Sequence, residues 1–286
     1  MSRLVHPRLA SVTRPVGLLR RPGYLLAWVV VLTILAWAVL PGLFVSADPL
    51  AADPVHKFDP PSLAHPFGTD YIGRDLFSRV VHGSALSLKA TVIALAVALA
   101  LSSVIGLLAG FVGGVADSVL MRLVDALLAI PNLLVSLLLI TALGFGTLNV
   151  AIAVGIASVA SFSRVMRAEV LRVSSRTFVE AARGLGLRWY AILVQHVMPH
   201  ASGPVLALIA LEFGNAILAI ASLSFLGFGA ELPAPEWGNL VAEGRNYLVT
   251  AWWMTTLPAL VVVATVVSAN RISRGPGGTL TAGTER

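Results

Sequence analysis

The sequence predicts an all-α protein that crosses a membrane with six transmembrane helices. Of its 286 residues, 57% are hydrophobic and only 12% are charged, whereas soluble domains carry roughly 25% charged residues. The apolar residues form continuous runs of about 20 residues, which is the length that a helix needs to cross the hydrocarbon core of a bilayer. A transmembrane β-barrel would instead show segments of about ten residues that alternate between apolar and polar side chains.

The six predicted spans lie at 24–44, 86–112, 119–143, 147–163, 203–229 and 250–269. The first run exceeds the 7–15-residue core of a secretory signal, so we expect it to remain as an uncleaved helix. Pro131 and Pro258 fall inside spans and should kink them, because proline has no N–H to donate. Gly106, Gly110 and Gly114 recur at four-residue spacing, which lets a neighbouring helix approach closely but also arises by chance in a chain rich in Ala and Gly.

Arginines predict the orientation of the chain. They precede the first span, fill the segment between the fourth and fifth spans, and follow the sixth, so six spans place all three groups on one side. Because excess Lys and Arg mark cytoplasmic loops, residues 1–23, the insert 164–200 and residues 271–286 are predicted to be cytoplasmic. The Pro- and Asp-rich segment 45–85 is then an extracytoplasmic loop, and its histidines match no compact set of metal ligands.

The insert begins with the signals of a short helix. Thr177 and Glu180 have the spacing of a capping box, which predicts a helix that begins near Phe178. Gly184 and Gly186 should end that helix, because glycine is favoured just beyond a helix C-terminus.

A second helix is expected in the insert from about Arg188 to Pro199. Its apolar stripe would consist of Leu185, Trp189, Ile192 and Leu193. These patterns leave two interpretations open, an amphipathic connector that lies on the lipid surface and a docking element for another protein.

No residue pattern in the chain predicts catalysis, a metal site or a bound cofactor. A P-loop ends in Gly-Lys-Ser/Thr, but the only lysines, Lys57 and Lys89, follow His56 and Leu88. The absence of cysteine excludes disulfides and thiolate metal sites. No serine elbow of the Gly-x-Ser-x-Gly type accompanies a histidine in the spans, which disfavours an intramembrane protease. The net charge of +6 comes from the orienting arginines and does not indicate nucleic-acid binding.

One stretch of the insert resembles a known family. EAARGLG, followed by HVMPH, is similar to the EAA loop of bacterial ABC importer permeases. Glu180, Ala181, Ala182, Gly186 and Pro199 match that motif at the family spacing.

Three further stretches resemble dipeptide and oligopeptide permeases in the same order along the chain. They are HPFGTDYIGRDLFSRVVHGSALSL at 65–88, MRLVDALLAIPNLL at 121–134 and ASLSFLGFGAELPAPEWGNLVAEGR at 221–245. His196 and Met198 replace the isoleucine and leucine of the general EAA pattern, and the histidine is similar to the peptide/nickel branch. The similarity extends over about 65–270 and is best to the C-type subunit of a dipeptide permease.

The resemblance implies a type I ABC importer permease core over 86–270, preceded by a first transmembrane helix at 24–44. The insert would be its coupling loop, docking on one or two separate subunits that bind ATP and Mg²⁺, so the chain itself would bind no cofactor. Glu180 would contact that subunit or brace the turn, Gly186 would permit the tight turn, and Pro199 would end the docking element before the fifth span.

The implied function is that of a permease subunit in the bacterial inner membrane, which imports short peptides at the expense of ATP. The implied partners are a second homologous permease subunit, the ATP-binding subunits, an extracytoplasmic substrate-binding protein and membrane lipid. Nickel or another small solute of the same branch is the alternative substrate. After Asn270 the chain departs from the usual family sequence, so a tail contact with the ATPase is not implied, and the Gly/Thr-rich residues 271–286 should be disordered.

Two carboxylates bear on a competing class, the ion-coupled secondary transporters, which use ionisable groups in their spans as relays. Asp125 lies three residues after Arg122, which favours a local ion pair. Glu212, in the fifth span, should face a cavity or a neighbouring helix. It would either line the pathway with Asn215 or simply pack beside that residue.

Overall fold

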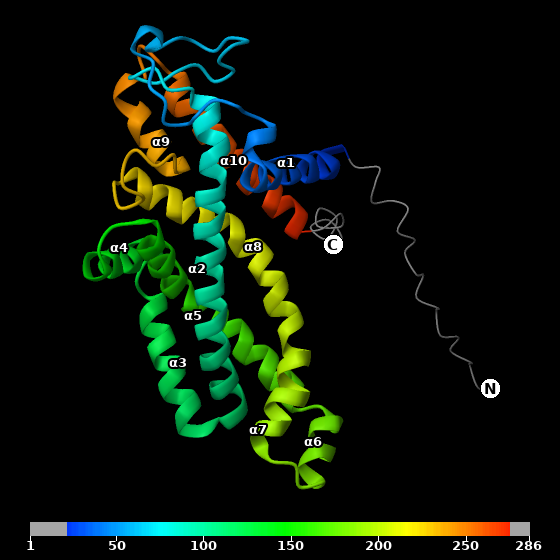
Figure 1. Cartoon of the computed structure of the whole chain (residues 1–286). Helices are drawn as coiled ribbons and strands as arrows, with labels where there is room; N and C mark the ends of the chain where they lie inside the picture. The colour runs from blue at the N-terminus through cyan, green and yellow to red at the C-terminus, as the bar shows by residue number, and fades with distance from the viewer. Residues whose placement is uncertain (1–21, 275–286) are drawn as a thin grey trace, which may run out of the picture.

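The computed structural model describes residues 22–274, where the longer regular elements are all helices (Figure 1). Five helices are long and apolar enough to cross a membrane. They are α1 (Pro22–Val39), α2 (Leu76–Val112), α5 (Thr147–Ser174), the helix Trp189–Phe225 that contains α7 (Trp189–Ile192) and α8 (Met198–Phe225), and α10 (Trp253–Ser273). The bent pair α3 (Gly114–Leu128) and α4 (Asn132–Leu143) makes a sixth span when it is counted as one. The predicted all-α membrane fold is thus confirmed for the described residues.

Shorter elements connect the spans. They are α6 (Thr177–Gly184), α9 (Trp237–Gly244) and the 3-10 turns Pro41–Leu43, Pro54–His56 and Arg245–Tyr247. The predicted cytoplasmic segment 1–23 is described only from Pro22, and the predicted tail 271–286 only through Arg274. Residues 271–273 form the end of α10, so the predicted disorder of the tail is wrong for them. The rest of both predictions lies outside the described residues.

Two helices extend beyond the apolar runs that predicted them. α2 begins at Leu76, within the predicted outer loop, because the Asp75 carboxylate caps the helix by accepting the N–H of Ser78 at 2.6 Å. α5 continues past its apolar run into the predicted insert, where the Arg167 guanidinium pairs with Asp117 of α3 at 2.5 Å. A polar cap therefore determines the start of α2, whereas the extension of α5 is held by the Arg167 pair and by buried apolar residues such as Val170.

The predicted kink at Pro131 is confirmed. α3 ends before it and α4 begins after it, and the two helices are bent by 95° across the break. Pro131 has ψ 131°, which is an extended rather than a helical conformation. By contrast, α10 runs through Pro258 as one helix.

Two of the three regularly spaced glycines bring α2 and α5 together. A Cβ atom at Gly106 would lie 2.5 Å from the Cβ of Met166, and one at Gly110 would lie 2.8 Å from a methyl group of Val170. The prediction of close approach is correct for these two positions. It is wrong for Gly114, which faces open space at φ +59° and begins α3.

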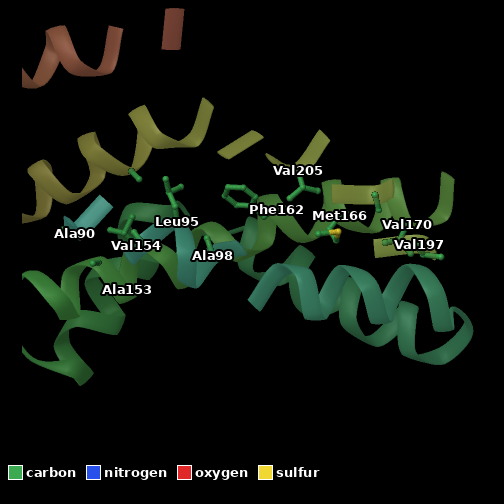
Figure 2. Close-up of a cluster of buried hydrophobic side chains, with 14 of the residues drawn as sticks. Ala90, Leu95, Ala98, Ala153, Val154, Phe162, Met166, Val170, Val197 and Val205 are labelled. Carbon is green, nitrogen blue, oxygen red and sulfur yellow. The ribbon is translucent and has the colours of Figure 1, made fainter. Parts of the chain in front are cut away.

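The main core forms where α2, α5 and α8 meet, and small side chains on α2 allow that close packing. Figure 2 shows part of this cluster, which includes Ala90, Leu95, Ala98, Ala153, Val154, Phe162, Met166, Val170, Val197 and Val205. The cluster continues into α6 through Val179 and Ala182. The short insert helix therefore shares the core of the long helices.

Candidate functional site

The candidate site has two parts at opposite ends of the molecule. α6 and α7 lie at one end of the long α2, and the segment before α2 lies with α9 toward the other end (Figure 1). We call these the insert end and the loop end. The sequence predicts that the insert end is cytoplasmic and the loop end extracytoplasmic.

α6 forms where the insert predicts a helix, but the predicted capping box is absent. Arg176 is the N-cap residue, and no side chain caps the helix. Thr177 is already the first helical residue, so its hydroxyl does not occupy the N-cap position. Glu180 is instead an exposed carboxylate in the first turn, where it interacts favourably with the helix dipole.

The turn after α6 has the conformation predicted for Gly186. Its φ of +75° is in the left-handed region, which glycine adopts without steric cost. The N–H of Gly186 donates to the carbonyl of Arg183 at 3.0 Å, and the N–H of Leu187 donates to the carbonyl of Ala182 at 3.2 Å. This pair of bonds is a Schellman motif, which satisfies carbonyls at the end of α6.

Apolar contacts fix the insert against the long helices. Val179 is 0% exposed and Ala182 4% exposed within the main core. The guanidinium of Arg183 lies over the Phe111 ring of α2, 5.5 Å from its centroid. A movement of α6 must therefore also displace the ends of α2 and α5.

The predicted apolar stripe of the insert divides into two parts. Ile192 and Leu193 are buried in the core, whereas Leu185 is 82% exposed and Trp189 is 58% exposed. Further exposed apolar or aromatic side chains nearby are Phe178, Leu187, Tyr190 and Val194. The insert thus presents an apolar outer surface as well as a buried inner one.

Pro199 does not end the second insert helix, so this prediction is wrong. The helix is continuous over Trp189–Phe225, and Pro199 lies in the first turn of α8. It follows a turn of π-helix at Leu193–Val197, where the N–H of Met198 donates to the carbonyl of Leu193. The wider i→i+5 turn accommodates a residue that lacks the N–H of a regular α-helix.

Glu212 and Asn215 line a cavity of about 290 Å³ together with residues of α4 and α5. The side-chain amide of Asn215 donates to Glu212 Oε2 at 3.3 Å. Glu212 therefore packs beside Asn215, as one alternative predicts, and it also faces a cavity. That the cavity belongs to a translocation pathway stays a prediction.

Asp125 pairs with a different residue than its sequence neighbours indicate. Arg164 of α5 reaches its carboxylate at 2.7 Å, so the predicted pair with Arg122 is wrong. Arg164 lies just beyond the apolar run of α5 and faces α3 there. It pairs with Asp125 in place of Arg122.

The loop end contains a buried charge cluster that the sequence did not reveal. Arg74 Nε lies 2.5 Å from Asp70 Oδ2, and Arg74 Nη2 lies 2.8 Å from Glu243 Oε2. Arg79 Nη1 lies 3.0 Å from Asp70 and 2.7 Å from Glu243. All four side chains are at most 8% exposed. We call Asp70, Arg74, Arg79 and Glu243 the charge quartet.

The charge quartet joins the start of α2 to α9. It contains two cations and two carboxylates, and such buried charges are tolerated when each has a well-placed partner. The loss of one member would leave an uncompensated charge, at a cost of about 3–5 kcal/mol. Sequence reasoning missed the cluster because Glu243 lies 164 residues from Arg79. The only sequence signal for this cluster was that the stretches 65–88 and 221–245 both contain acidic and basic residues next to apolar ones.

Glu236 is a second buried acid at the loop end. It is 0% exposed and accepts the N–H of Gly238 at 3.3 Å, which caps α9. Within residues 22–274, no basic side chain pairs with it. Burial raises the pKa of this carboxyl, because the charged form loses its hydration.

An all-α chain with several membrane-length helices and an exposed insert between two of them defines a multi-pass membrane protein. Residues 102–274 match the family described as the binding-protein-dependent transport system inner membrane component. The chain belongs to this family, which is a transport permease component of the inner membrane and not a catalytic enzyme. Membership confirms the resemblance to importer permeases that the sequence motifs indicated.

Related permeases are similar to this chain over most of its length. The probable D,D-dipeptide transport system permease protein DdpC of Escherichia coli (strain K12) is 38% identical over 87% of this chain and 83% of its own length. The dipeptide transport system permease protein DppC of Alkalihalophilus pseudofirmus is 33% identical over 86% of this chain and 81% of its own length. The glutathione transport system permease protein GsiD of Pectobacterium atrosepticum is 37% identical, with 75% and 71% covered.

A solved structure supports the fold. It is the crystal structure of an amino acid ABC transporter with histidines, which aligns with a TM-score of 0.52 at 17% identity. The alignment covers 69% of this chain and 92% of that chain. At this identity the likeness establishes the shared fold alone.

Proposed function

We propose that this chain is the permease subunit of an ATP-driven importer of short peptides in the bacterial inner membrane. It forms the translocation pathway together with a second, homologous permease subunit. The similarity to permeases named for dipeptide transport, 33–38% identical over 86–87% of the chain, carries this proposal. The cavity that contains Glu212 and Asn215 is a candidate section of the pathway.

The insert is the surface through which ATP hydrolysis drives transport. Separate ATP-binding subunits, which hold ATP and Mg²⁺, dock against its exposed apolar face. Glu180 and Ala181 are exposed and available for contact, while Ala182 lies buried beneath them. The φ of Gly186 sets the direction of the turn.

Transmission of the motion follows from the packing of the insert. Because α6 shares its core with α2 and α5, closure of the ATP-binding subunits shifts these helices along with it. The pathway then alternates between outward and inward access. Such a transition requires contacts that differ in free energy between the two states.

The orientation of the chain places both termini and the insert in the cytoplasm. The excess of arginine in those three segments supports this orientation. An extracytoplasmic binding protein then delivers its peptide at the loop end. The segment before α2 and the loop around α9 are the surfaces that it meets.

Uptake in cells that lack this chain tests the proposal. We expect uptake of labelled di- and tripeptides to be lost in the deletion strain and restored by the wild-type chain. Nickel uptake, measured in parallel, should be the same in both strains. Unchanged peptide uptake with a collapse of nickel uptake would show that the substrate assignment is wrong.

A further inference from the structure

A cavity of about 580 Å³ opens at the loop end of the molecule. It lies between the end of α8, α9 and the 3-10 turn Arg245–Tyr247. The cavity around Glu212 ends at Leu223, and this one begins at Ser224 on the same helix. Residues of α8 thus line both cavities.

The charged groups of this cavity differ in whether they already have a partner. Glu243 belongs to the charge quartet and is neutralised by Arg74 and Arg79. Glu231 and Arg245 also line the cavity, and both side chains are exposed. Neither forms an ion pair with any residue in the described part of the chain. One carboxylate and one guanidinium therefore share a cavity with their charges available to a ligand.

Neighbouring structure holds the guanidinium in place. Arg245 lies over the ring of Phe225, 5.8 Å from its centroid, and this stacking restricts the side chain. Glu243, two residues earlier, anchors the end of α9 to the buried quartet. The cation is thus presented from a fixed backbone, which lowers the entropic cost of binding an anion.

Aromatic rings form part of the cavity wall. Tyr71 stacks on Tyr247 with 5.9 Å between ring centroids, and both residues line the cavity. Such walls accept side chains of varied shape without requiring a fixed charge. A volume of about 580 Å³ is in the range of pockets that enclose small organic ligands, roughly 300–1,000 Å³.

We propose that this cavity is a transit subsite for zwitterionic short peptides at the outward mouth of the pathway. Glu231 receives the α-ammonium group of the peptide, and Arg245 receives its α-carboxylate. Every short peptide with free termini carries these two charges, whatever its side chains. The inference rests on the proposed function and specifies which chemical feature of the substrate the permease itself recognises.

Proteoliposomes with the complete importer and a saturating amount of dialanine-loaded binding protein test the subsite. We expect Glu231→Gln and Arg245→Gln each to lower the number of peptides transported per ATP hydrolysed by about tenfold, the effect of one lost charge-assisted hydrogen bond. ATP hydrolysis should continue, and the affinity of the complex for the loaded binding protein should be unchanged. Arg122→Gln, an exposed charge change on α3 and outside this cavity, is the matched control and should behave as wild type.

The possible failures are distinguishable. Wild-type peptide transport by both variants would overturn the subsite and leave the proposed function intact. A weaker affinity for the binding protein would also overturn it, because the two residues would then belong to a docking surface. A wild-type complex that imports no peptide would refute the proposed function, and the subsite with it.

Discussion

At the scale of single residues, Glu236 shows how the loop end depends on protonation. Its carboxyl is fully buried and caps α9 through the N–H of Gly238. Burial raises its pKa in the folded state above the unfolded value. The stability that this group contributes is therefore fully present below the unfolded pKa, about 4.3, and is lost as the pH rises through the folded pKa.

Glu236→Gln should remove this dependence, because glutamine keeps the capping oxygen and carries no charge. We expect a higher melting temperature than wild type at pH 8, by about 2–4 °C for each kcal/mol recovered. The difference should shrink as the pH falls towards 4. Thermal unfolding of the purified chain in detergent measures both effects. A variant less stable than wild type at pH 8 would show that the carboxylate is ionised and satisfied in the folded protein.

At the scale of elements, the turn between α6 and α7 is the position where one substitution tests the insert. Gly186→Val should strain the backbone by roughly 1–3 kcal/mol, since valine is disfavoured at φ +75°. We expect peptide uptake and coupled ATP hydrolysis to fall while membrane insertion survives. Gly184→Ala is the control, because Gly184 is helical and a Cβ there meets open space. Wild-type uptake by the Gly186→Val variant would instead support the interpretation of the insert as a passive connector.

The same elements show which parts of the fold could be predicted from the sequence. Apolar runs identified the spans, because burial in lipid requires continuous hydrophobicity. They did not identify the ends, since α5 is extended by residues such as Arg167 that pair with another helix. The capping-box prediction is wrong because α6 begins one residue earlier than the box requires, with Arg176 at the N-cap position. Pro199 was misjudged because a π turn, which has no sequence signature, accommodates it.

At the scale of the whole molecule, the proposed function requires partner subunits to supply the energy for transport. It contains no Gly-Lys-Ser/Thr sequence that could form a P-loop. We therefore expect the purified chain to hydrolyse no ATP, and hydrolysis to appear only when ATP-binding subunits are co-purified. A malachite-green phosphate assay with and without those subunits measures this. Hydrolysis by the chain alone, at a rate that survives repeated purification, would contradict the expectation.

Family-like motifs marked both ends of the molecule in the sequence, but only the structure shows which residues of the loop end lie together. Glu180 and Gly186 belong to one short stretch, so their spacing could be compared with a family pattern. The quartet joins Arg79 to Glu243 across most of the chain. Glu231 and Arg245 likewise gain a common cavity only through the fold of α8 and α9. Long-range pairing of polar residues leaves no periodic pattern in a single sequence.

α2 connects these two ends as one unbroken rod. Arg79 in its first turn holds the quartet, and Phe111 in its last turn lies under the guanidinium of Arg183. At about 1.5 Å per residue, its 37 residues extend over roughly 55 Å. For a rigid rod of that length, a tilt of about 5° with the insert end as pivot would carry the opposite tip by roughly 5 Å. We therefore expect a rotation imposed at the insert to move the first turn of α2, to which the quartet fastens α9.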